Sequence, residues 1–98
     1  MNSTEIQLYK FGQVFSSRPE GREAALSAIA YHLGKNLHEN VIIDFDQVLI
    51  MTPSWLSEFI QTLKQHGIKS VSYKNSTNKS VASSIEMIEL EAKASSGS

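Results

Sequence analysis

The segment that decides the fold is residues 41–56, which read Val-Ile-Ile-Asp-Phe-Asp-Gln-Val-Leu-Ile-Met-Thr-Pro-Ser-Trp-Leu. Residues 41–45 form a largely β-branched run, which is typical of a central strand that is covered on both faces. A second apolar run ends at Met51. Thr52 and Pro53 follow, and they predict the N-cap and the first position of a helix. The segment therefore predicts a buried strand, an apolar connection and a helix start.

The residues on either side alternate between strand-like and helix-like patterns. Residues 6–11, 14–15 and 69–73 have the short alternating or apolar patterns of strands. With the strand at 41–45 and three helices, the predicted order is β-β-α-β-α-β-α. This order predicts an α/β fold with a small, mostly parallel four-stranded sheet and three packed helices.

The three helices are predicted from their caps and their apolar stripes. The first begins at a capping box of Ser17 and Glu20 and ends at Gly34 or Asn36, and Gly67 stops the second. The residues expected to face the core recur at helical spacing: Leu26, Ile29, Ala30 and Leu33 in the first helix, Leu56, Phe59, Ile60 and Leu63 in the second, and Val81, Ile85, Ile88 and Ala92 in the third.

The length and the composition predict one domain. The chain has 98 residues, of which 41% are hydrophobic, and this is enough for one core. We expect the domain to span residues 1–94 with a radius of gyration of about 13 Å. The serine- and glycine-rich residues 95–98 are predicted to form a flexible tail.

Charge, cysteine content and hydropathy exclude several classes of function. Nine basic and ten acidic residues give no overall attraction to phosphate, so we expect no nucleic-acid partner. The absence of cysteine excludes disulfides and thiol catalysis. The apolar runs are far shorter than the roughly 20 residues of a membrane span, and no signal peptide is recognisable, so we expect a cytoplasmic protein without membrane contact. The residues show no metal-ligand or nucleotide-binding pattern, so we predict no metal, no cofactor and no catalytic residue.

The motifs of the central segment resemble those of the STAS domain, the module shared by sulfate transporters and anti-sigma-factor antagonists. In that family a strand with Asp-Leu-Ser-x-Val leads to Asp-Ser-Ser-Gly at a helix start. Asp44 and Val48 match the first motif, and Thr52, Pro53 and Ser54 occupy the Asp-Ser-Ser positions.

A closer resemblance is to a STAS-like family of unknown function, over roughly residues 6–75. Its members have Phe-Gly, Ser-Arg, Asp-Phe-x-x-Val and Ser-Phe-x-x-Glu in this order. The corresponding residues here are Phe11-Gly12, Ser17-Arg18, residues 44–48 and residues 54–58. The chain departs from the switching antagonists where Trp55 replaces their glycine and Thr52-Pro53 replaces Asp-Ser.

The resemblance implies a non-enzymatic, regulatory protein-interaction domain. Its partner would be a histidine-kinase-like ATPase, as with anti-sigma factors, and pairing of two copies is also left open. Docking would use the strand–loop–helix segment 44–59, with Asp44, Asp46, Thr52, Ser54, Trp55 and Glu58 as the site residues. Ser54 matches the serine that is phosphorylated in partner-switching members. We expect Glu58 to pair with Arg18 and to join the first two helices.

Alternatives are open at several of these positions. Trp55 is either an exposed interface anchor or a side chain packed under the edge of the sheet. Ser54 is either a phosphorylation site or an ordinary first-turn residue beside the capping Thr52. Asp44, Asp46 and Ser54 would alternatively serve a small enzyme or a nucleotide-responsive domain, since residues two apart on a strand face the same side. Against this, an aspartate that closes a strand more often bonds to loop backbone.

Overall fold

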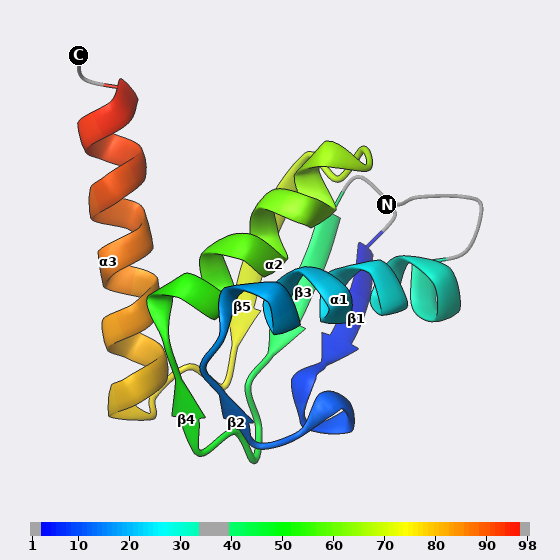
Figure 1. The fold of residues 1–98 in the computed structure, drawn as a ribbon, viewed down its shortest axis with the longest axis horizontal. Helices are drawn as coiled ribbons and strands as arrows, with labels where there is room; N and C mark the ends of the chain where they lie inside the picture. Colours follow the sequence, from blue (N-terminus) through cyan, green and yellow to red (C-terminus); the bar gives the residue numbers. More distant parts are fainter. Residues whose placement is uncertain (1–2, 34–39, 97–98) are drawn as a thin grey trace.

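Three parallel strands form the main sheet of the structure, a computed structural model that describes residues 3–33 and 40–96 (Figure 1). β1 (Ser3–Gln7), β3 (Asn40–Asp44) and β5 (Ser70–Lys74) lie in the order β1-β3-β5. Both pairings are parallel, so each connection must cross the sheet, and the helices supply these crossovers. β1 begins three residues before the predicted strand at 6–11 and shares only residues 6–7 with it, because Leu8–Phe11 form a turn of 3₁₀-helix instead.

A second sheet of two parallel strands lies at one end of the molecule, at the bottom of Figure 1. It pairs β2 (Val14–Phe15) with β4 (Ile50–Met51). The prediction of one four-stranded sheet is therefore wrong, and the observed order is β-β-α-β-β-α-β-α. The chain turns after β3 at Gln47, whose φ of 68° is in the left-handed region. This turn directs the following apolar run to β2 and away from the main sheet. The coarser prediction of a small α/β fold with three helices and parallel strands is confirmed.

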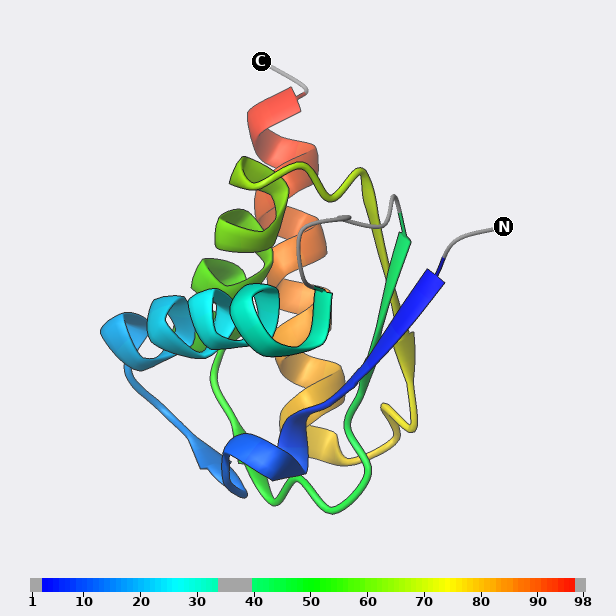
Figure 2. The same ribbon diagram turned by 90° about the vertical axis from the view of Figure 1, so that its right-hand side faces the viewer.

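Two of the three helices cover one face of the main sheet. α1 (Arg18–Ala28), which continues as a π-helical turn (Ile29–Leu33), and α2 (Pro53–Gln65) both lie on this face (Figure 2). α3 (Lys79–Ser96) lies beside α2 along the edge of the molecule (Figure 1). It extends two residues past the point where we predicted the tail to begin.

The other face of the main sheet is open among the described residues. It carries polar side chains, including an ion pair between Lys74 Nζ and Glu5 Oε1 at 3.2 Å. Ile42 on this face is only partly buried. The prediction that the central strand is covered on both faces is therefore wrong, because all crossovers run on the same side.

The predicted helix starts are confirmed in detail. Ser17 Oγ accepts a hydrogen bond from the backbone N–H of Glu20 and donates one to its carboxylate at 2.7 Å. Thr52 Oγ1 accepts from the backbone N–H of Trp55 and caps α2. α2 stops as predicted before Gly67, whose φ is 105°. The predicted end of the first helix at residues 34–36 lies outside the described residues.

The face of α1 that packs inward differs from the prediction. Its buried residues are small, namely Gly21, Ala24, Ala25 and Ala28. Of the predicted stripe, Leu26 and Ala30 are exposed, Ile29 is partly buried and packs against the core, and the side chain of Leu33 lies outside the described residues. The reason is the close approach of α2, because a Cβ atom on Gly21 would lie 2.4 Å from the carbonyl oxygen of Trp55. Only a stripe of small residues allows α1 to approach α2 this closely, although the predicted stripe of larger residues has the same helical spacing.

The core is formed between the main sheet and the helices. Its largest fully buried side chains are Trp55, Phe45, Phe59, Ile6, Leu8, Ile43, Leu56 and Leu63. The radius of gyration of 12.7 Å agrees with the predicted value. No helix in the described part of the chain is long and apolar enough to cross a membrane.

Candidate functional site

The segment 44–59 runs from the end of β3 through the short sheet into α2. Its predicted site residues have two different environments. Asp44 and Trp55 are buried, whereas Asp46, Thr52, Ser54 and Glu58 are exposed or partly exposed. Only the exposed and partly exposed residues can contact a partner directly.

Trp55 belongs to the core, with an exposed fraction of 1%. Its ring stacks on Phe59 with 5.0 Å between the centroids, and it lies 4.5 Å from the ring of Phe15 on β2. The interpretation as an exposed anchor is therefore wrong, and the packed alternative is confirmed. A variant without this ring is expected to lose stability, so it does not test partner binding.

Asp44 holds the loops that follow β3 and β5. Its Oδ1 accepts hydrogen bonds from the backbone N–H of Asp46 at 2.9 Å and from Asn75 Nδ2 at 2.8 Å. Burial pushes the pKa of the Asp44 carboxyl upward, but these hydrogen bonds and the positive charge of Lys74 outweigh it, so that the pKa lies below its ordinary value of 3.8. The expectation that a strand-closing aspartate bonds to loop backbone is confirmed.

This geometry predicts an acid-sensitive contribution of Asp44 to stability. Ionised Asp44 stabilises the fold above the ordinary pKa of 3.8, which we take for the unfolded chain, and this stabilisation is lost as the pH falls through the lower folded-state pKa. Asp44→Asn removes the charge, and it should lower the free energy of unfolding at pH 7 by about 1–2 kcal/mol. Urea unfolding at pH 7 and at pH 3 measures this, and the difference from wild type should shrink at the lower pH.

The matched control is Asp46→Asn, the same charge change at an exposed position two residues later. It should leave the free energy of unfolding within about 0.5 kcal/mol of wild type. Equal losses in the two variants, or a loss at Asp44 that does not depend on pH, would contradict the role given to Asp44.

The carboxylates named in the enzyme alternative lie in different surroundings. The Asp44 carboxylate is engaged within the fold, and Asp46 lies in an exposed turn. Among residues 3–33 and 40–96, no group of three or more histidine, aspartate or glutamate side chains is placed to hold a metal ion. The Asp44 carboxylate fixes the loops that follow β3 and β5.

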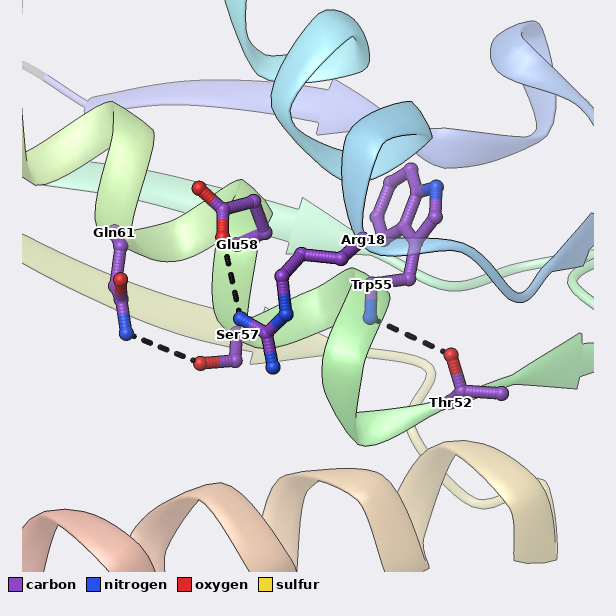
Figure 3. A network of polar contacts seen from close by, with 6 residues as sticks. All are labelled: Arg18, Thr52, Trp55, Ser57, Glu58 and Gln61. Atoms are coloured by element: carbon purple, nitrogen blue, oxygen red, sulfur yellow. Dashed lines mark hydrogen bonds and ion pairs between the residues drawn. The ribbon is translucent and has the colours of Figure 1, made fainter.

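The start of α2 is tied to β2 and to α1. Besides capping α2, Thr52 Oγ1 is 3.2 Å from the carbonyl oxygens of Phe15 and Ser16, to which it can donate. Arg18 Nη1 lies 3.2 Å from Glu58 Oε1, so the predicted pair is confirmed. Figure 3 shows this ion pair as a dashed line. Half of the arginine side chain is exposed, so this pair contributes little to stability. Ser54 is the second residue of α2 and is partly exposed.

Three exposed apolar side chains that were not predicted from the sequence form what we call the β2–β4 face. These are Val14, Leu49 and Ile50, with exposed fractions of 61%, 55% and 47%. Val14 and Ile50 are register partners in adjacent strands and so lie side by side. Their neighbours Phe15 and Met51 point into the core. In each of these two-residue strands the first side chain points outward and the second points inward. This alternation identifies an outward face only when the pairing of β2 with β4 is known.

A shallow hollow of about 240 Å³ adjoins the β2–β4 face. Val14, Phe11 and Phe15 contribute its apolar lining, and Glu20 and Glu23 of α1 contribute carboxylates. The hollow therefore combines an apolar floor with negative charge.

The start of α3 bonds to the backbone of β4 at one edge of the short sheet. On the β4 side, Ser80 Oγ accepts from the backbone N–H of Met51 and lies 2.7 Å from its carbonyl oxygen. The carbonyl oxygens of Gln13 and Phe15 accept hydrogen bonds from backbone N–H groups of residues 49–52, so these carbonyls face β4. Alternate residues of a strand direct their backbone groups to opposite edges, so those of Val14 face away from β4.

Comparisons of the chain with protein-family models, with curated proteins and with solved structures found no match. The likeness to the STAS-like family therefore stays a prediction that rests on the motifs.

Proposed function

We propose that this chain is a non-enzymatic, STAS-like regulatory domain that binds a protein partner through the β2–β4 face. The observation that carries the proposal is the exposure of Val14 and Ile50 on a sheet of only two strands, together with Leu49 immediately before β4. Large apolar side chains that gather on the surface are typical of protein-interaction sites. Leu49 and Ile50 lie within the segment 44–59, where the motifs place the docking site.

The surroundings of this face define the chemistry of the partner. The apolar floor of the hollow suits an aliphatic or aromatic side chain, and Glu20 and Glu23 suit a lysine or arginine beside it. The outward backbone groups of Val14 would also accept an extended segment as a further strand. The partner surface would therefore present an apolar residue next to a basic one.

The identity of the partner as a histidine-kinase-like ATPase comes from the family resemblance alone. The resemblance also implies phosphorylation of Ser54 as the switch. A phosphate there would lie in the first turn of α2, where the helix dipole favours an anion, and would add negative charge one turn from β4. Intact-mass measurement of the chain after incubation with the ATPase and ATP tests this step.

Photo-crosslinking in the cells that produce the chain tests the docking face. Benzoylphenylalanine replaces Val14 in one variant and Ile50 in another, and it replaces the exposed Tyr31 of the π-helical turn in a matched aromatic control. We expect the same protein, with an ATPase fold, to be crosslinked from positions 14 and 50 and not from 31. Absence of an adduct at both sheet positions, or equal adducts at all three, would contradict the proposed site.

A further inference from the structure

The outer side of α3 carries an apolar stripe that stays exposed in the described part of the chain. Met87 and Leu90 have exposed fractions of 50% and 55%. With Ser83 they are spaced by four and three residues, which places them along one side of a helix. The opposite side holds Val81 and Ile85, which pack toward the core. Figure 1 shows no other element on the outer side of α3.

The charges beside this stripe are complementary to those of a second copy. Glu86 precedes Met87, and Lys93 follows Leu90 by three residues. In an antiparallel helix pair in which Met87 packs on Leu90 of the other copy, Glu86 of one helix lies beside Lys93 of the other. A two-fold axis repeats every contact, so this ion pair forms twice. In a parallel pair, Glu86 would instead lie at the same height as Glu86 of the other helix, and Lys93 at the same height as Lys93.

We propose that two copies associate through their α3 helices in this antiparallel arrangement. A hollow of about 230 Å³ lined by Ser83, Glu86, Met87 and Leu90 gives each copy room for an apolar side chain of the other. The contact is small, so the dimer is weak and reversible. It uses a different surface from the β2–β4 face, so failure of either proposal leaves the other in place.

Sedimentation equilibrium between about 10 μM and about 1 mM chain tests the association. The wild-type chain should change from monomer to dimer over this range. Leu90→Glu should raise the dimer Kd at least about tenfold, because it places a charge at the centre of the contact. The matched control Leu26→Glu, at an exposed leucine of α1, should leave the Kd unchanged.

Charge reversal tests the antiparallel arrangement. Glu86→Lys and Lys93→Glu should each weaken the dimer, and the double variant should restore it, since the opposite charges meet again with their order exchanged. Circular dichroism confirms that α3 stays folded in each variant. A chain that is monomeric at about 1 mM, a dimer that Leu90→Glu does not weaken, or a double variant without restoration overturns the proposal.

Discussion

Replacement of Gly21 by alanine should lower the free energy of unfolding by about 2 kcal/mol, although alanine is the better helix former. Alanine in place of glycine stabilises a helix by about 1 kcal/mol. At this position its Cβ would lie 2.4 Å from the carbonyl oxygen of Trp55 and 3.1 Å from the carbonyl carbon. These atoms belong to the backbone of α2, so one helix must move away from the other. Overpacking of this kind costs about 1–3 kcal/mol, or more when the backbone shifts, and the clash therefore outweighs the propensity.

Urea unfolding of Gly21→Ala beside Glu23→Ala measures this effect. Glu23 is an exposed residue of the same helix, so its replacement should change the free energy of unfolding by no more than about 0.5 kcal/mol. If Gly21→Ala were as stable as wild type, the close packing of α1 on α2 would be wrong.

Trp55→Ala is expected to cause the largest loss of stability, about 4 kcal/mol. The indole is buried between Phe15 of the short sheet and Phe59 of α2, so its removal leaves a cavity where both meet. A loss of this size is a large part of the 5–15 kcal/mol that stabilises a typical domain. Circular dichroism in urea should show a much lower unfolding midpoint.

Tyr31→Ala is the aromatic control for this substitution. Tyr31 is the most exposed of the large hydrophobic side chains in the described residues, so its loss should cost less than about 0.5 kcal/mol. The intrinsic fluorescence of the wild-type chain offers a second check, because Trp55 is its only tryptophan. Emission typical of a water-exposed indole, or equal midpoints for the two variants, would contradict the buried position.

The sequence predicts the local features of this fold well. Caps depend on residues three apart in the chain, so Ser17 with Glu20 and Thr52 with Pro53 identified the starts of α1 and α2. The buried side of α1 could not be predicted in this way. Two stripes share the helical spacing, and the choice between them depends on the distance to α2, which the sequence does not contain.

The division into two sheets depends on a similar long-range choice. Residues 48–51 are as apolar as a strand of the main sheet, and only the pairing with residues 14–15 assigns them elsewhere. The burial of Trp55 follows from the same pairing, since Phe15 covers its ring. The motif-based site therefore mixed residues of the core with residues of the surface, and the β2–β4 face appeared only after the pairing was known.

The affinity for the crosslinked partner tests the central claim, docking through the β2–β4 face, most directly. Isothermal titration of the purified partner compares the wild-type chain with Val14→Asp/Ile50→Asp and with the control Tyr31→Asp. Two charges at the centre of an apolar contact should raise the Kd about 100-fold, which corresponds to about 2.7 kcal/mol, and the control should bind like wild type. A folded double variant that binds with the wild-type Kd would contradict the account.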